Sequence, residues 1–274
     1  MKKIIYFNIF SVLVALLVVM ASGYGLYHQD LYSHAEPSFL RLLINQDFVL
    51  LVIFIPLLLI STWMTAQNSF RAVLIWLGTM GYLCYVYTGY AFGCVSGKLF
   101  LLHITIAAFS FFLFLTKLAT IDAEEFRLRF AVTSFGFIAF FMLVMALFIE
   151  TLWLQTLIPL FSTPVFMFSL LDLKTVLAVK VLDLAFLGPL SFLAGFWLFA
   201  RKAVGYILTA VLLVIIPAKF GTMISDFNFY LSLSQSNLIF SLITLVALIL
   251  LICFQKKLKE EKLTSYHERI SNIF

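Results

Sequence analysis

Residues 48–66 read FVLLVIFIPLLLISTWMTA and contain no charged side chain. An α-helix needs about 20 apolar residues to cross the hydrocarbon of a bilayer, so this stretch predicts a transmembrane helix. Seven further apolar runs of comparable length lie at about 4–26, 72–92, 99–117, 130–154, 175–200, 203–225 and 236–255. The sequence therefore predicts an all-α polytopic transmembrane bundle of about eight helices.

The composition excludes a soluble domain. Hydrophobic residues make up 64% of the chain and charged residues 11%, and the mean hydropathy is +1.10. Soluble domains carry about 45–50% apolar and about 25% charged residues. A transmembrane β-barrel predicts short alternating segments, whereas the apolar runs here are long and continuous. We expect the lipid bilayer as the surroundings, and no nucleic acid partner, because the net charge of +5 is concentrated in turns and in the tail.

The first run follows Met1-Lys2-Lys3 and could be mistaken for a signal peptide, with Val19-Met20-Ala21 as a cleavage-like triplet. Signal h-regions span about 7–15 residues. This run is longer and continues through aromatic residues, so we interpret it as an uncleaved helix.

The distribution of Lys and Arg predicts the orientation, because cytoplasmic loops carry an excess of both. With the N-terminus inside, most of the 18 basic residues are cytoplasmic, and eight helices return the C-terminus to the same side. The basic residues left at or near the outer side are Arg41, Lys98, Lys174, Lys180 and Lys219. We expect both termini to lie in the cytoplasm.

Recurring features favour two parallel four-helix repeats, with halves 1–118 and 128–255 of a transmembrane domain 1–255. After the first and fifth helices, outer segments with Pro37 and Pro164 lead to Asp47 and Asp172. The next helix of each half carries a proline and a tryptophan, Pro56 and Trp63 in the first half and Pro189 and Trp197 in the second. A short basic turn follows each of these helices, with Arg71 in the first half and Arg201-Lys202 in the second. Chance similarity between apolar helices is the alternative. The outer segments are predicted as short amphipathic interfacial helices or as loops.

The tail 256–274 is basic, and Leu263, Ile270 and Ile273 recur at helical spacing. An amphipathic basic helix binds anionic lipid at a membrane surface. We expect the tail to bind anionic lipid in the cytoplasm or to dock on a membrane protein partner.

Two blocks covering about half of the chain resemble a group of uncharacterised bacterial polytopic membrane proteins. The first block comprises Gln46-Asp47, Pro56 to Leu59, Arg71, Trp76 to Gly78, Gly81 to Leu83, Tyr85, Tyr87, Tyr90, Phe92-Gly93 and Leu99 to Leu102. The second comprises Val181 to Leu184, Pro189-Leu190, Leu193 to Gly195, Arg201 and Gly205-Tyr206. Relatives typically carry Asn in the tyrosine run where this chain has Val86. The resemblance implies a bacterial inner-membrane protein and no particular activity.

Ionisable residues inside a membrane segment are functional candidates. Lys180 and Asp183 are three residues apart, so they share a helix face. Lys219 and Asp226 lie near the outer end of the next helix, and Pro217 can kink that helix. If the two helices are neighbours, Asp183 and Lys219 come to similar depth. They then line a polar cavity open to the outside, or they form an ion pair that only holds the helices together.

Further candidates lie in the outer halves of the third and fourth helices. His103 is a packing residue or a proton-transfer group, since histidine titrates near neutral pH. Glu150, at the outer end of its helix, is expected to be solvated or to join an acidic rim with Asp47, Asp172 and Asp226. The tyrosines form an interfacial aromatic belt, or two of them line the outer cavity with their hydroxyls: Tyr82, Tyr85, Tyr87 and Tyr90.

Several kinds of chemistry find no support in the sequence. Cys84, Cys94 and Cys253 show no metal-ligand spacing, and no structural disulfide is expected. There is no phosphate-binding glycine loop, no H-E-x-x-H and no nucleophile elbow. We therefore expect no metal and no cofactor.

Three functions stay open. The first is a transporter-like or channel-like protein with an outward-facing polar cavity. The second is a non-catalytic subunit or scaffold of a membrane complex. The third is an intramembrane lipid-modifying enzyme, which would need His103 within hydrogen-bond reach of a carboxylate. Catalysis is the weaker expectation of the three.

Overall fold

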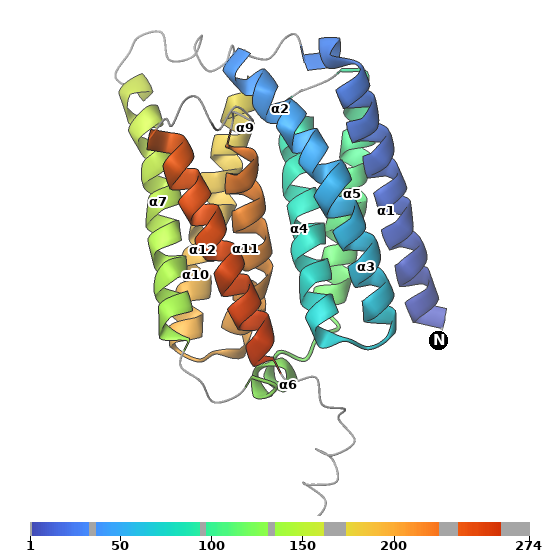
Figure 1. The fold of residues 1–274 in the computed structure, drawn as a ribbon, viewed down its shortest axis with the longest axis vertical. Coiled ribbons are helices and arrows are strands. Elements are labelled where there is room, and N and C mark those ends of the chain that lie inside the picture. The colour runs from blue at the N-terminus through green and yellow to red at the C-terminus, as the bar shows by residue number, and fades with distance from the viewer. Residues whose placement is uncertain are drawn as a thin grey trace, which may run out of the picture.

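The computed structural model describes residues 2–32, 37–93, 97–130, 135–161, 174–224 and 235–258. In these ranges the chain is helical, and eight helical stretches are long and apolar enough to span a membrane (Figure 1). Large apolar side chains such as Tyr6, Met20 and Leu147 are exposed around the bundle. In water this surface would be unstable, and in lipid it is solvated. The protein is a multi-pass, all-α membrane protein.

The first half of the bundle contains four spans. They are α1 (Lys2–Tyr27), the combined helix α2 (Pro37–Val49), η2 (Leu50–Phe54) and α3 (Ile55–Ala66), then α4 (Phe70–Phe92) and α5 (Phe100–Leu118). A short helix η1 (Gln29–Tyr32) follows α1. The prediction of a separate short interfacial helix or a loop after the first helix is therefore wrong for this segment. It continues into the second span, because no glycine or proline interrupts residues 38–55.

The second half repeats this order of elements. It contains α7 (Gly136–Phe161), the combined helix α9 (Lys174–Leu182), η3 (Asp183–Leu187) and α10 (Gly188–Phe199), then α11 (Ala203–Thr222) and α12 (Gln235–Lys257). A short helix α6 (Ala123–Leu128) joins the halves and begins where the Asp122 side chain accepts hydrogen bonds from the Glu124 and Glu125 amides. The second interfacial segment, with Pro164 and Asp172, lies outside the described residues.

A π-helical turn occurs at the same place in each half, two residues before a proline. In the first, the Ile55 amide donates to the Leu50 carbonyl, and Pro56 follows. In the second, the Gly188 amide donates to the Asp183 carbonyl, and Pro189 follows. A proline ring clashes with the carbonyl four residues earlier, and the wider turn relieves that contact. The extra residue also rotates the helix before the turn by about 100° relative to the helix after it.

The turns that follow these spans also match. Asn68 and Arg201 have positive φ angles of 63° and 54°. The prolines, the starts of the π turns and the positive-φ residues of the second half each lie 133 positions after their counterparts, as the pairs 56 and 189, 50 and 183, and 68 and 201 show. Each half thus contains the same bend and the same turn at the same spacing.

The two halves meet along α4 and α11. Gly78 of α4 lies directly against Val214 of α11, where an added Cβ would be 2.5 Å from the Val214 Cβ. Gly81 faces Val211 and Ile215 one turn further along. Each of these two helices also contacts a further helix of the other half, since α9 packs on α4 and α2 packs on α11. The glycines therefore set the distance between the two helices that carry most of the polar side chains described below.

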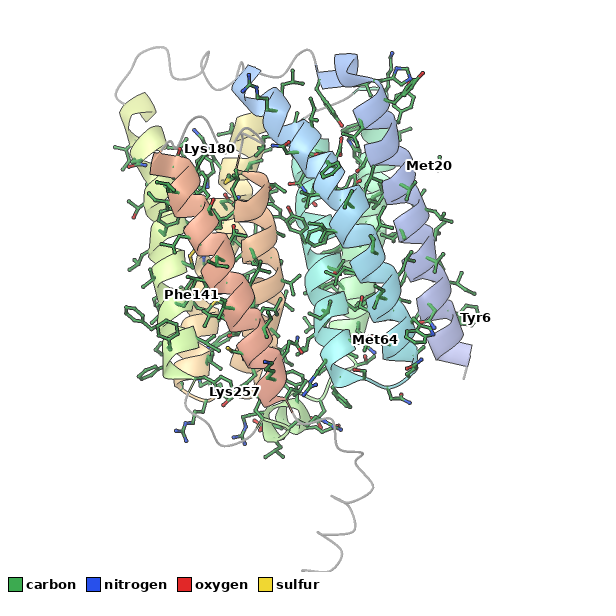
Figure 2. The ribbon with its side chains drawn as sticks, viewed as in Figure 1. Tyr6, Met20, Met64, Phe141, Lys180 and Lys257 are labelled. Atoms are coloured by element: carbon green, nitrogen blue, oxygen red, sulfur yellow. The ribbon has the colours of Figure 1, made fainter. Side chains whose placement is uncertain are left out.

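At the end of the bundle near α6, the last span is tied to the first half (Figure 1). The Arg71 Nη2 donates to the Leu258 carbonyl at 2.9 Å, and Phe130 pairs with Leu258 through backbone hydrogen bonding. Figure 2 shows Lys257 at this end and Lys180 at the opposite end, which we call the α2 end. The tail from residue 259 onward lies outside the described residues.

Substituting Gly78 by alanine should destabilise the protein. The new methyl group would overlap the Val214 side chain, and overpacking of this kind costs about 1–3 kcal/mol. The free energy of unfolding in detergent or bicelles measures the effect. Gly23→Ala is the matched control, because nothing lies within 4 Å of a Cβ at that position. Equal effects of the two substitutions would show that the α4–α11 contact is not close-packed.

Candidate functional site

The buried charges gather at the α2 end around Asp183. Asp183 is the first residue of the π turn η3 and is fully buried, and Lys219 of α11 is 3% exposed. The Lys219 ammonium donates to the Asp183 carboxylate, forming an ion pair. Placement of these two residues at the same depth agrees with the sequence-based expectation.

Two further donors complete the ion pair. The Tyr85 hydroxyl donates to Asp183 Oδ1 at 2.7 Å and accepts from Lys219 Nζ at 2.7 Å. The Trp153 indole of α7 donates to Asp183 Oδ2 at 2.5 Å. Lys180 Nζ lies 5.5 Å from the Trp153 ring centroid, a cation–π distance. Four elements, η3, α4, α7 and α11, thus contribute to the hydrogen bonds of a single carboxylate.

Glu150 lies beside this cluster. The sequence placed it at the end of its helix, but α7 continues to Phe161 because residues 151–158 contain no glycine or proline. Glu150 is half-buried, and its Oε1 fills the space that a Cβ on Gly188 would need. The carboxylate therefore packs against the first turn of α10 and not at a helix terminus.

A second polar cluster surrounds Asp47 in the first half. Asp47 is 1% exposed. It accepts a hydrogen bond from the Tyr32 hydroxyl, and Tyr90 Oη lies 3.5 Å from its Oδ1. The Tyr87 hydroxyl bonds to Ser22 of α1 at 3.1 Å. Burial raises the pKa of the Tyr32 phenol above its usual range, so this group remains a proton donor. Asp47 belongs to the protein interior and not to an exposed acidic rim.

The four tyrosines of α4 do not form a simple interfacial belt. Tyr82, Tyr87 and Tyr90 are buried, and Tyr85 is half-buried. Each hydroxyl has a specific partner, and Tyr82 donates to Gln46 Oε1 at 3.0 Å. Because successive side chains point in different directions around a helix, α4 reaches both the Asp183 and the Asp47 clusters.

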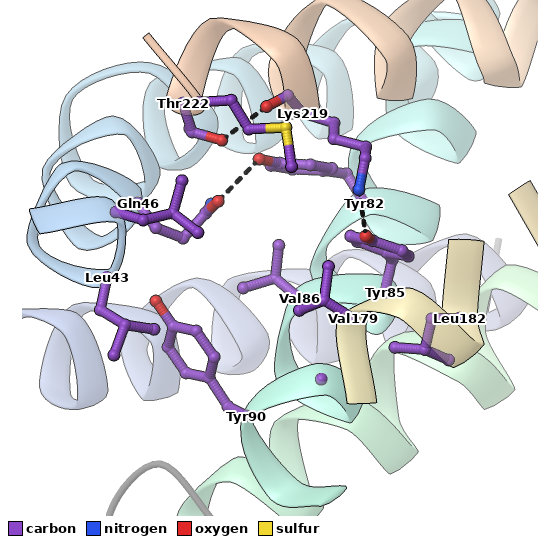
Figure 3. A pocket seen from close by; sticks show the side chains of 13 residues that line it. Leu43, Gln46, Tyr82, Tyr85, Val86, Tyr90, Val179, Leu182, Lys219 and Thr222 are labelled. Carbon is purple, nitrogen blue, oxygen red and sulfur yellow. Dashed lines mark hydrogen bonds between the residues drawn. The ribbon is translucent and has the colours of Figure 1, made fainter. Parts of the chain in front are cut away.

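A small cavity lies between the two clusters, where α2, α4, α9 and α11 meet (Figure 3). Its volume is about 50 Å³. A buried water needs about 10–15 Å³ on this measure, so the cavity has room for a few waters. Polar groups reach it from Gln46, Tyr82, Tyr85, Tyr90, Lys219 and Thr222. The remaining wall is largely apolar: Leu42, Leu43, Val86, Val179, Leu182 and Met223.

One cavity donor has no partner. Gln46 is buried and its Oε1 accepts from Tyr82, but its Nε2 has no hydrogen-bond partner among the described residues. Sequence reasoning noted Gln46 only within a resemblance and did not identify it as a site residue. The unsatisfied amide marks the cavity as a place for a hydrogen-bond acceptor, such as water or a solute oxygen.

His103 lies behind the tyrosines. Its ring is 5.6 Å from the Tyr87 ring and 5.3 Å from the Tyr90 ring, measured between centroids. Its Nδ1 has no hydrogen-bond partner among the described residues. Its described neighbours are thus aromatic rings, which is the environment of a packing residue.

Other expected features lie elsewhere. Asp226, and Cys94 with it, fall outside the described residues. Cys84 and Cys253 are free thiols. Among the described residues, no group of three or more His, Cys, Asp and Glu side chains could hold a metal ion.

Comparison of the chain with protein-family models, with curated proteins and with solved structures finds no match.

Removing one member of the buried ion pair should be far more damaging than removing both. Lys219→Met leaves the Asp183 charge buried without its cation, and such changes cost about 3–5 kcal/mol. The double variant Asp183→Asn/Lys219→Met removes both charges and should recover most of that loss. Unfolding free energies of both single variants and the double variant give the coupling. Simple addition of the single effects would contradict a direct pairing.

Proposed function

We propose that the protein moves a small polar solute across the membrane through the cavity at the α2 end. The observation that supports this proposal is a cavity at the junction of the two halves whose mainly apolar wall carries several polar side chains. It offers the Lys219 ammonium, tyrosine hydroxyls and the unsatisfied Gln46 amide. Polar groups in a membrane interior are costly and mark substrate or ion pathways.

The hydrogen-bonding character of the cavity favours a solute with an acceptor oxygen. Lys219 has three N–H groups, of which Asp183 and Tyr85 accept two. The third N–H and the Gln46 amide are donors. In the state described here the cavity has room for only a few waters, so entry of a solute requires α2 or α9 to move relative to α4 and α11.

The two halves are proposed to be a duplication. The matching π turns, prolines and positive-φ turns at a constant spacing of 133 positions support it. Bundles built from parallel repeats place substrate sites at the repeat interface, which is where the cavity lies.

We further propose that the α2 end faces outward and the α6 end faces the cytoplasm of a bacterial cell. Basic side chains at the α6 end outnumber those at the α2 end, as expected for cytoplasmic loops. Among the described residues, those at the α6 end are Arg71, Lys117, Arg127, Arg129, Arg201, Lys202, Lys256 and Lys257.

Filling the cavity tests transport without touching the ion pair. Val179 lines the cavity, whereas Val181 on the same helix is 51% exposed on the bundle surface. Liposomes containing the protein are shrunk osmotically, and their re-swelling is followed in urea, glycerol, alanine and lactate. Val179→Phe should lower the re-swelling rate for the transported solute at least tenfold, towards that of protein-free liposomes. Val181→Phe should leave it unchanged.

Two results would contradict the proposal. One is a wild-type rate equal to that of protein-free liposomes for every solute in the panel. The other is a transported solute whose rate Val179→Phe does not reduce although the variant is folded. Thermal unfolding of each purified variant confirms that the substitution has not disrupted the bundle.

A further inference from the structure

Asp47 is a buried carboxyl group whose hydrogen-bond partners are neutral. Tyr32 and Tyr90 provide the hydroxyls that face it, from η1 and α4. Gly25 of α1 makes room for this arrangement, because a Cβ there would lie 2.5 Å from Asp47 Oδ2 and closer still to the Tyr32 hydroxyl. The close fit shows a built site and not a side chain that happens to be covered.

No cationic side chain touches Asp47 among the residues that the structure describes. From α11, Lys219 is bound to Asp183 and Tyr85. Directly after α1, His28 lies against the rings of Tyr24 and Tyr27. Arg41, which lies on α2 as Asp47 does, is exposed. The other titratable groups around Asp47 are phenols, namely Tyr32 of η1 and Tyr87 and Tyr90 of α4, and His103 of α5 lies against the two α4 tyrosine rings. The π turn η2 has no titratable side chain.

Asp183 and Asp47 differ in whether a cationic side chain is in contact with the carboxyl group among the described residues. Both carboxyl groups are buried at the α2 end, and Asp183 has a lysine ammonium as partner. An isolated carboxylate in a low-dielectric interior is strongly unfavourable, and such a group becomes neutral or acquires a cation. We infer that Asp47 is a proton-binding site, occupied by a proton in the state described here.

Tyr90 provides a route for that proton to the cavity. It is the residue whose side chain both lines the cavity and reaches Asp47. The Asp47 carboxyl proton passes to Tyr90 Oη while the phenolic proton of Tyr90 passes to a cavity water. The phenol is restored, Asp47 becomes a carboxylate, and the proton leaves on the water. Uptake is the reverse of this step.

This site stands whether or not the cavity conducts a solute. If transport is confirmed, a proton at Asp47 would be available to couple with it. If transport fails, the protonated carboxyl remains measurable by itself, so the two proposals can fail separately.

Infrared spectroscopy of the purified protein in lipid nanodiscs tests the inference directly. At neutral pH the wild-type protein should show the C=O stretch of a buried carboxylic acid, with a small downshift after exchange into D₂O. Asp47→Asn should abolish this band. Glu150→Gln is the control, because it removes a different carboxyl group, which is half-buried, at the same end of the bundle. The band should persist in this variant.

Tyrosine variants keep the test decisive if Asp47→Asn does not fold. Tyr32→Phe removes the hydrogen bond to Asp47 and should shift the band to higher frequency. Tyr90→Phe should retain the band and slow its hydrogen–deuterium exchange at least tenfold. Absence of the band in the wild-type protein would overturn the inference, as would its loss in Glu150→Gln and not in Asp47→Asn. A band that appears only after Na⁺ and K⁺ are removed would also overturn it, in favour of a bound metal cation.

Discussion

The buried pairing of Asp183 with Lys219 is the interaction on which the polar end of the bundle depends. Two opposite charges can remain inside a membrane protein only where each has its counter-charge and the remaining hydrogen bonds are satisfied. Tyr85 and Trp153 satisfy them here. Because these groups come from four different elements, the requirement fixes the positions of α4, α7, α11 and the π turn relative to one another. The close α4–α11 contact at Gly78 makes the same positions sterically compatible.

The two halves accommodate a buried carboxyl group in different ways. In the second half, the charge is balanced within the chain by a lysine. In the first half, Asp47 is surrounded by phenols and has no cation in contact among the described residues. If the halves share an origin, the polar positions around these carboxyl groups have diverged while the backbone bends were retained. Val86 and Lys219, which are 133 positions apart, illustrate this divergence, since an apolar side chain in one half matches the buried ammonium of the other.

Much of the fold could be predicted from the sequence, because hydrophobic length is a strong constraint in a bilayer. The eight apolar runs correspond to the eight spans, and Asp183 and Lys219 are conspicuous as charges inside two of them. The partners Ser22, Tyr32, Gln46 and Trp153 were missed as site residues, since ordinary polar and aromatic side chains carry no local signal of a contact far away in sequence. The π turns were missed as well. Pro56 and Pro189 were noted only as a recurring pair, and how a helix widens before a proline depends on tertiary packing.

The contact of Arg71 with the Leu258 carbonyl has a consequence for biosynthesis. A membrane helix enters the bilayer soon after it leaves the ribosome, so α4 is in place long before α12 has been made. The contact between Arg71 and the Leu258 carbonyl can form only when α12 has inserted with its last turn next to α6. Until then the first four spans and the later ones are joined mainly through α4 and α11. Formation of the Arg71–Leu258 contact would therefore mark the point at which a nascent chain becomes a complete bundle. Before that point, a quality-control protease would encounter a less tightly packed protein.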